Sequence, residues 1–208
     1  MQPPTLHTAR LRLDAVRPDD TPLVAQYCAD VELQRYIPVP VPYTREHADD
    51  YCVNYARAAA EGEGALWAIR WGDVESGITV ADTGASPIVE GLLGVIELKP
   101  EPLGSAELGF WLGAPHRSRG VMSEAARAVC DWALRPDGLE LSRIFWRAIA
   151  GNIGSASVAR SCGFRFEGLW RAALPHRDQR VDAWCATLLA TDSRDPKPGW
   201  PAPLEALR

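Results

Sequence analysis

The stretch "HRSRGVMSEAARAVCDWAL", residues His116–Leu134, joins a short basic turn to an amphipathic helix. Apolar residues recur with helical spacing from Met122 to Ala133, and Gly120 stands directly before them. The first N–H groups of a helix lack intrahelical partners and carry positive partial charge, so a glycine turn at this point can bind an anion. Arg117 and Arg119 add positive charge. Taken alone, the pattern fits a solvated basic turn more often than an anion site.

The composition is that of an ordinary globular protein. The chain has 208 residues, 47% of them hydrophobic, and a formal charge of −5, which disfavours a nucleic-acid partner. No run of eighteen apolar residues predicts a membrane span, and the N-terminus lacks a secretion signal. Five scattered cysteines without a CxxC pair suit reduced thiols and indicate no metal site. We therefore expect a cytoplasmic protein that binds neither metal, membrane nor nucleic acid.

Alternation and periodicity predict a mixed α+β fold. The predicted strands cover residues 10–16, 65–71, 88–100, 106–115, 141–150, 164–174 and 181–190. The predicted helices cover residues 22–28, 44–61, 120–134 and 152–163. We expect a mostly antiparallel central sheet flanked by helices, in a single domain over residues 1–191. The proline-rich tail over residues 192–208 is expected to be an extended appendage.

Charge is distributed unevenly along the chain. Residues 61–90 hold six acids against Arg70 alone, whereas residues 141–180 hold seven arginines against two acids. The basic half suits a polyanionic ligand. The acidic stretch suits a cationic acceptor, or is simply a solvated loop.

Two motifs at a suitable separation carry a resemblance to a known family. The strand "ELGFWL", the turn "HRSRGVMSEA", the strand "RIFWRAIAGN" and the helix "NIGSASVARSCGFRFEG" follow one another along the chain. This succession resembles the GCN5-related N-acetyltransferases (GNAT), within them the group that includes the ribosomal-protein acetyltransferases RimJ and RimL. The resemblance runs from Thr5 to about Ala190 and implies the GNAT fold.

The resemblance implies acetyl-coenzyme A, or another short acyl-CoA, as co-substrate. In that family an R/Q-x-x-G-x-G/A turn wraps the pyrophosphate, and here Arg117, Gly120 and Met122 hold those positions. Met122 departs from the usual small residue, which backbone N–H binding tolerates. The residues expected around the cofactor are Trp111, Leu112, Arg117, Ser118, Arg119, Gly120, Val121, Met122, Ser123, Asn152, Ser155 and Arg160.

Acyl transfer to an amine requires a neutral amine, a stabilised oxyanion and a proton for the departing thiolate. Glu107 is the first candidate for the base, with pairing to a basic side chain as the alternative. Glu97 is the second, with an ordinary surface position as the alternative. Ser155 is the candidate acid, or a cofactor ligand. An α-amine, with a reference pKa near 8, needs a weaker base than a lysine near 10.4.

The acceptor is expected to meet residues from loops and strand ends. Tyr36 and Tyr43 flank the proline-rich loop "IPVPVP", which would form a stiff apolar wall or simply pack. Asp182 would bind the amine or brace a hairpin. With Glu97, these residues form the predicted acceptor site.

Several functions remain open at this stage. The resemblance favours transfer of an acetyl group to a protein α-amine or a small amine by direct attack. Alternatives are a succinyl-CoA-dependent or antibiotic-modifying enzyme, and a non-catalytic acyl-CoA-binding protein. Eight tryptophans leave room for an aromatic contact in a homodimer.

Overall fold

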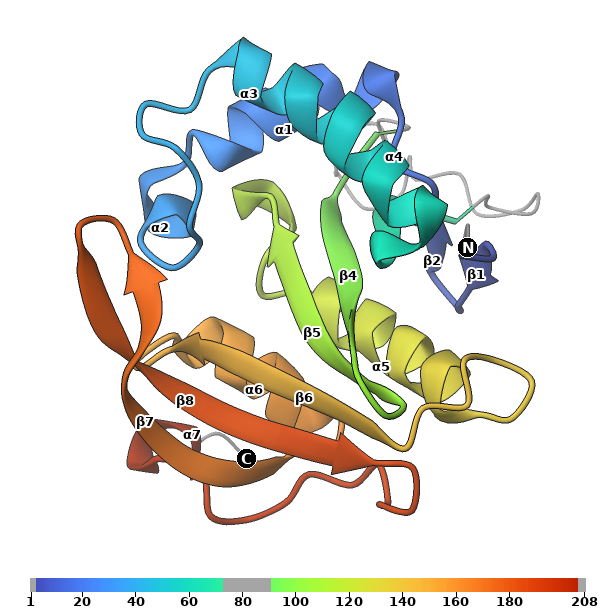
Figure 1. The fold of residues 1–208 in the computed structure, drawn as a ribbon, viewed down its shortest axis with the longest axis vertical. Helices are drawn as coiled ribbons and strands as arrows, with labels where there is room; N and C mark the ends of the chain where they lie inside the picture. The colour runs from blue at the N-terminus through green and yellow to red at the C-terminus, as the bar shows by residue number, and fades with distance from the viewer. Residues whose placement is uncertain (1–2, 73–90, 206–208) are drawn as a thin grey trace, which may run out of the picture.

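The computed structural model describes residues 3–72 and 91–205, and in this part eight strands form one sheet in the order β1-β2-β3-β4-β5-β6-β8-β7 (Figure 1). Neighbouring strands are antiparallel except β5 and β6, which are parallel. The strands are β1 (Leu6–His7), β2 (Leu11–Asp14), β3 (Ala65–Trp71), β4 (Gly94–Glu101), β5 (Ser105–Leu112), β6 (Arg143–Ile149), β7 (Arg165–His176) and β8 (Gln179–Leu189). The expected mixed α+β fold with a mostly antiparallel sheet is confirmed.

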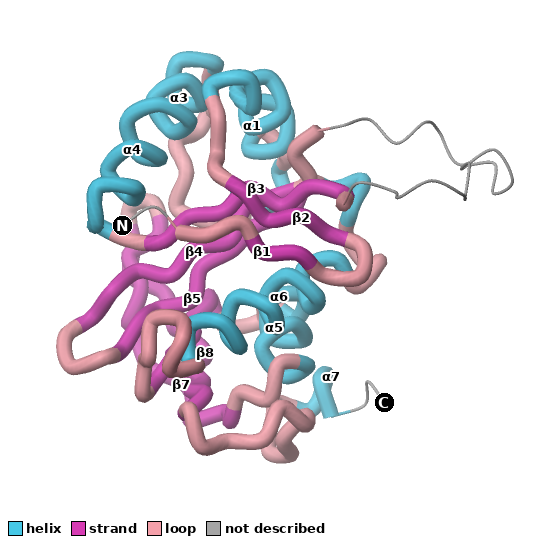
Figure 2. The backbone as a smooth tube through the Cα atoms, turned by 90° about the vertical axis from the view of Figure 1, so that its right-hand side faces the viewer, coloured by secondary structure: helices cyan, strands magenta, loops and turns pink. Residues whose placement is uncertain are grey.

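Helices cover both faces of the sheet (Figure 2). On one face lie η1 (Pro18–Asp20), α1 (Thr21–Cys28), α2 (Val31–Gln34), α3 (Arg45–Asp50), η2 (Tyr51–Tyr55), α4 (Ala56–Ala58) and η3 (Ala59–Glu63). On the other lie α5 (Val121–Leu134) and α6 (Ile153–Ser161), preceded by the 3₁₀ turn η5 (Ala114–His116) and followed at the C-terminal end by α7 (Ala202–Glu205). Each face therefore has its own apolar core, one under α5 and α6 and one under α1–α4.

The sheet is forked between its two parallel strands. Pairing of β5 with β6 runs from Ser105 and Arg143 to Glu107 and Phe145. Past these pairs the two strands diverge, and the opening faces α2 and the tip of the β7–β8 hairpin (Figure 1). The N–H of Gly113 donates to the carbonyl of Leu93 on the β4 side (2.9 Å), so strand alternation points the N–H groups of Phe110 and Leu112 into the fork.

The second predicted helix is less regular than expected. Instead of one α-helix over residues 44–61, helical backbone runs from α3 through η2 and α4 to η3, and η2 and η3 are π-helical turns. Thr44 caps it as expected, by accepting from the N–H of His47 (3.4 Å). Gly62 has φ +117°, which ends the regular helix near the predicted stop.

The tail corrects one expectation. Residues 192–205 do not form an extended appendage, because Trp200 and Leu204 are buried in the core under α5 and α6. Arg194 also pairs with Asp131 of α5 (Nε to Oδ1, 2.8 Å). Between these anchors the chain bends at Asp195 and Pro198 and has φ +91° at Gly199, which brings it back to the domain.

Three short elements were not predicted from the sequence. Strand β1 has two residues, and α2 and α7 have four each, too few to show a period. The last hairpin turns at Arg177 and Asp178 rather than over residues 175–180, with φ +54° at Arg177. The start of the predicted strand 88–100, and most of the acidic stretch 61–90, lie outside the described residues.

Candidate functional site

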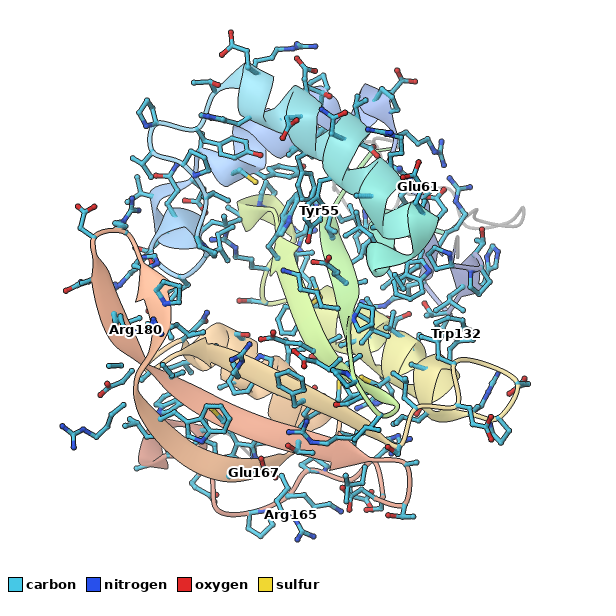
Figure 3. The ribbon with its side chains drawn as sticks, viewed as in Figure 1. Tyr55, Glu61, Trp132, Arg165, Glu167 and Arg180 are labelled. Atoms are coloured by element: carbon cyan, nitrogen blue, oxygen red, sulfur yellow. The ribbon has the colours of Figure 1, made fainter. Side chains whose placement is uncertain are left out.

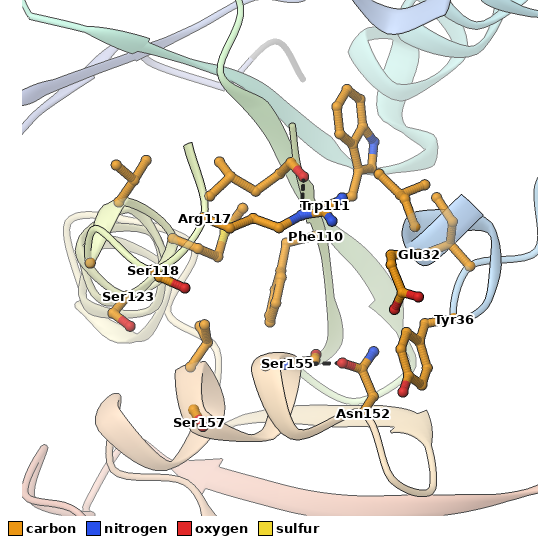
Figure 4. A pocket seen from close by; sticks show the side chains of 18 residues that line it. Glu32, Tyr36, Phe110, Trp111, Arg117, Ser118, Ser123, Asn152, Ser155 and Ser157 are labelled. Carbon is orange, nitrogen blue, oxygen red and sulfur yellow. Dashed lines mark hydrogen bonds between the residues drawn. The ribbon is translucent and has the colours of Figure 1, made fainter. Parts of the chain in front are cut away.

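A cleft of about 470 Å³ opens in the fork between β5 and β6 (Figure 4). Its walls come from α2, the end of β5, the turn before α5 and the first turns of α5 and α6. The lining residues are Glu32, Leu33, Tyr36, Ile37, Phe110, Trp111, Leu112, Arg117, Ser118, Gly120, Val121, Met122, Ser123, Asn152, Gly154, Ser155, Ser157 and Val158. We refer to it as the first cleft.

The turn before α5 presents backbone N–H groups to the first cleft. Ser118 (φ +60°) and Gly120 (φ +73°) both adopt left-handed backbone, and Gly120 is the N-cap of α5. The N–H groups of Val121, Met122 and Ser123 belong to the first turn of that helix, where they have no intrahelical acceptor. This backbone, with the positive end of a 14-residue helix behind it, fits a phosphate group.

The side chain of Arg117 is engaged in the wall of the first cleft. Its Nε donates to the carbonyl of Leu112 (3.0 Å), and its guanidinium pairs with Asp30 (2.7 Å). Asp30 is the N-cap of α2 and accepts from the N–H of Glu32 (3.2 Å). Arg117 therefore ties the end of β5 to α2, and its charge is already paired within the protein.

A second ion pair holds the turn from the other side. Glu124, in the first turns of α5, accepts from the Nε of Arg10 (2.7 Å) and from the hydroxyl of Thr8 (2.5 Å). Another nitrogen of Arg10 donates to the carbonyl of Arg119 (3.1 Å). Partial burial opposes ionisation of Glu124, but the bonds from Thr8 and Arg10 lower its pKa on balance. Arg10 and Glu124 thus fix the turn to β2, a role that the sequence analysis missed.

The first turn of α6 supplies the opposite wall. Asn152 is the N-cap, and its side-chain oxygen accepts from the N–H of Ser155 (3.1 Å). The hydroxyl of Ser155 accepts from the indole N–H of Trp146 (3.0 Å), which leaves its own proton free to be donated. Figure 4 shows Asn152 and Ser155 side by side at the edge of the cleft.

A second cleft of about 420 Å³ lies on the α1–α4 side of the fork. Its lining residues are Cys28, Ile37, Pro38, Val39, Pro40, Tyr43, His47, Asp50, Tyr51, Tyr55, Val95, Glu97, Lys99, Gly109, Phe110 and Trp111. Ile37, Phe110 and Trp111 line both clefts. The two clefts therefore meet at the end of β5.

Glu97 is held in the second cleft by a tyrosine. Its Oε1 accepts from the hydroxyl of Tyr55 (2.5 Å), and Lys99 lies 3.6 Å from its Oε2. Tyr55 reaches toward β4 from the helical layer (Figure 3). Burial, together with the negative charge of Glu97, raises the pKa of Tyr55, and burial raises that of Tyr51. These phenols stay neutral near pH 7, so of these three side chains only that of Glu97 can serve as a proton acceptor.

Comparison with known proteins identifies the family. Residues 10–165 match the model of the acetyltransferase (GNAT) domain. The chain belongs to the GNAT acetyltransferase family. It is 28% identical over 186 residues to the uncharacterized N-acetyltransferase p20 of Bacillus licheniformis. The aligned region covers 89% of this chain and 96% of p20.

Solved structures share the fold of this GNAT acetyltransferase. RimJ of Mycobacterium smegmatis in complex with CoA-disulfide superposes with a TM-score of 0.73 and 19% identity, over 91% of this chain and 90% of RimJ. The microcin C7 self-immunity acetyltransferase MccE, in complex with acetyl-CoA and AMP, gives 0.72 and 14%, over 88% and 93%. RimJ belongs to the group that the sequence motifs resemble.

Most of the predicted cofactor residues of this GNAT acetyltransferase come together. The first cleft gathers Trp111, Leu112, Arg117, Ser118, Gly120, Val121, Met122, Ser123, Asn152 and Ser155. Arg119 and Arg160 are not among its lining residues. The side chain of Arg119 is exposed, and the backbone carbonyl of Arg119 accepts from Arg10. Arg160 lies in the last turn of α6, away from the cleft end of that helix.

Glu107 is placed elsewhere than expected. It lines neither cleft and forms a two-bond ion pair with Arg147 of β6, at 3.0 Å and 2.7 Å. This ion pair is the alternative given above for Glu107, pairing with a basic side chain. Glu97 is the candidate base that reaches a cleft.

The predicted acceptor residues divide among three places. Tyr43 and Glu97 line the second cleft, whereas Tyr36 lines the first, where its hydroxyl approaches the carbonyl of Gly151 (3.5 Å). Asp182 lines neither cleft. It accepts from the N–H of Ala172 (2.8 Å), a residue with φ +50° in the irregular part of β7, and therefore braces the hairpin.

Helical periodicity could have found some of the residues that were missed. His47, Tyr51 and Tyr55 recur every four positions and share one face of the helical segment that lines the second cleft. Gly154, Ser157 and Val158 stand at positions i, i+3 and i+4 and therefore share one face of α6. The sequence around Phe110 gives no comparable signal. Alternation along a strand shows which residues share a face of the sheet, but not which face borders a cleft.

Two further findings concern metal ligands and membrane-spanning helices. Among the described residues, no group of three or more His, Cys, Asp or Glu side chains is arranged to hold a metal ion. No helix in residues 3–72 and 91–205 is both long enough and apolar enough to cross a membrane.

Proposed function

We propose that this GNAT acetyltransferase transfers the acetyl group of acetyl-coenzyme A to a primary amine by direct attack. The observation that carries the proposal is the junction of the two clefts at Ile37, Phe110 and Trp111. A glycine turn with free backbone N–H groups opens into the first cleft, and a carboxylate lies in the second. A non-catalytic acyl-CoA-binding protein has no need of a carboxylate on the far side of the fork.

The first cleft would hold the coenzyme. The turn from Ser118 to Gly120 and the N–H groups that follow it would bind the pyrophosphate. Asn152 and Ser155 on α6 lie across the cleft, where the pantetheine arm would pass. When bound, the thioester supplies the electrophilic carbonyl. This assignment agrees with the complexes of RimJ and MccE named above, which share the fold.

Each chemical requirement has a residue of this chain to meet it. Glu97 would take a proton from the acceptor amine, and Tyr55 orients its carboxylate. The N–H groups of Phe110 and Leu112 face the fork and would stabilise an oxyanion there. Ser155, whose oxygen is occupied by Trp146, would donate its proton to the departing thiolate.

The junction favours an acetyl donor over succinyl. The three residues shared by the clefts carry apolar or aromatic side chains, and none of them is a cation that would pair with a succinyl carboxylate. A competition between acetyl- and succinyl-coenzyme A, read by the mass of the acylated amine, tests the donor. Predominant succinyl product would reverse the assignment.

Thiol release from acetyl-coenzyme A, measured with a panel of primary amines and peptides, tests the reaction. We expect amine-dependent release and an acetylated product identified by mass spectrometry. Tight binding of acetyl-coenzyme A without turnover of any amine would overturn the proposal in favour of a binding protein.

Replacing Glu97 by glutamine tests the base. The loss of a positioned proton acceptor is expected to lower kcat by about 10²-fold, with acetyl-coenzyme A affinity unchanged. Glu107→Gln is the matched variant on the neighbouring strand, and its pH–rate profile should keep the wild-type shape. A pH–rate profile altered by Glu107→Gln and not by Glu97→Gln would return the role of base to Glu107.

A further inference from the structure

The floor of the second cleft is open beside Glu97. Gly109 on β5 pairs with Glu97 on β4, so both residues face the same side of the sheet. A Cβ atom added at Gly109 would meet no heavy atom within 4 Å among the described residues, and its backbone is not in the left-handed region. A side chain could therefore be accommodated by the fold, and its absence leaves room for a ligand.

The walls around this space are apolar and aromatic. On one side lies the rigid segment Ile37–Pro40. On the other lie Tyr51 and Tyr55, whose rings stack with centroids 5.1 Å apart at 14°. Their pKa values are raised mainly by burial, so the phenols present neutral surfaces. Such walls suit a hydrocarbon or aromatic group more than a charged one.

The charged residues of the second cleft favour a cation. Asp50 and Glu97 contribute two carboxylates against the single ammonium of Lys99. Lys99 is 54% exposed and lies beside the Oε2 of Glu97, so its charge is turned toward solvent and toward that carboxylate. If an acceptor carried a carboxylate next to its amine, binding of the amine beside Glu97 would bring the two carboxylates together. Their like charges would repel each other.

We propose that the acceptor is a primary amine on a compact apolar or aromatic body, without an adjacent carboxylate, and that Gly109 provides the room for that body. The proposal rests on the proposed function and names its substrate class. The cleft volume of about 420 Å³ suits a small molecule rather than a folded protein surface.

Three amines test the substrate class with acetyl-coenzyme A as donor. Phenethylamine carries an aromatic body, phenylalanine adds a carboxylate to that body, and ethylamine removes the ring. We expect kcat/KM for phenethylamine to exceed both others by about 10-fold or more. Equal or better turnover of phenylalanine would overturn the proposal.

Gly109→Val tests the role of the open floor, with Gly109→Ala as the graded control. Valine suits a strand and would occupy the space beside Glu97. We expect the ratio of kcat/KM for phenethylamine over ethylamine to fall by about 10-fold in the valine variant and less in the alanine variant. Melting temperature and acetyl-coenzyme A affinity should match the wild type. A defective fold would lower turnover of both amines together, whereas an unchanged ratio would contradict the role of Gly109.

The outcomes separate this inference from the proposed function. Turnover of peptide N-termini but not of phenethylamine would overturn the substrate class and keep the acetyltransferase. Turnover of no amine, with acetyl-coenzyme A still bound, would overturn both.

Discussion

Gly120 shows at the scale of one residue how the first cleft is built. Its φ of +73° is costly for a β-branched side chain, because Cβ then crowds the following backbone. Of the arginines beside it, Arg117 is engaged with Leu112 and Asp30, and the exposed side chain of Arg119 does not line the first cleft. Backbone N–H groups therefore provide the main phosphate contacts that we propose.

His116, directly before that turn, makes the stability of the region depend on pH. Burial, and then the charge of Arg119, lower the pKa of His116, and its Nε2 lies 3.0 Å from the hydroxyl of Tyr27. A lowered pKa in the folded state means that protonation favours unfolding. The stability from neutral His116 is thus present above about pH 6.5 and lost as the pH falls through the folded-state value.

We predict that His116→Gln is less sensitive to acid than the wild type. Melting temperatures measured from about pH 7.5 to about pH 5 should fall less in the variant, because glutamine does not titrate there. An equal fall in both proteins would contradict the assignment of this pH dependence to His116.

At the scale of elements, the fork depends on how β5 and β6 are joined at its base. Glu107 and Arg147 bridge the two strands next to the pair Glu107–Phe145, and the ring of Phe145 lies below the guanidinium groups of Arg143 (4.8 Å) and Arg147 (5.3 Å). Both partners are partly exposed, so their direct contribution to stability is about 1 kcal/mol or less. Their larger effect is expected on the geometry of the fork.

Exchanging the two charges tests this positioning role. Glu107→Arg alone should lower kcat/KM by about 10-fold, because like charges would push the strands apart at the base of the fork. The double variant with Arg147→Glu should recover most of that loss, which the loss of a catalytic carboxylate would not allow. Glu167→Gln, on β7 outside both clefts, is the matched control. Failure of the exchange to rescue activity would count against the role.

Elements with a clear period could be predicted from the sequence. Strands such as Ala65–Trp71 and helix α5 lie close to their predicted ranges, and the glycine turn lines a cleft as expected. Side-chain pairing could not be predicted, because Arg10 and Glu124, or Glu107 and Arg147, meet only once distant segments are packed. For the same reason the ion pair of Glu107 was only one of two alternatives, and Tyr55, which donates to Glu97, was missed.

At the scale of the whole molecule, the C-terminal segment connects the core to the site. Trp200 packs against Trp146 (centroids 5.9 Å apart) and Phe166 (5.3 Å). The indole of Trp146 in turn donates to Ser155 in the first cleft. The segment expected to be an appendage therefore supports the residue that we propose as the acid.

We predict that Trp200→Ala lowers the free energy of unfolding by about 3 kcal/mol or more, because it opens a cavity in the core. Chemical denaturation measures the change. Trp170→Ala is the control, since Trp170 is 48% exposed on the edge strand β7 and should cost about 0.5 kcal/mol or less. Equal effects of the two substitutions would contradict the packing of the tail.

The proposed function requires that the backbone turn at the start of α5 holds the coenzyme. Calorimetric titration of acetyl-coenzyme A into Gly120→Val and Arg119→Ala measures this binding, with melting curves to show that both variants are folded. We predict that the valine variant loses affinity by about 10-fold or more and the alanine variant by much less. A greater loss in Arg119→Ala than in Gly120→Val would show that the arginine side chain, and not the backbone turn, makes the main contact with the coenzyme.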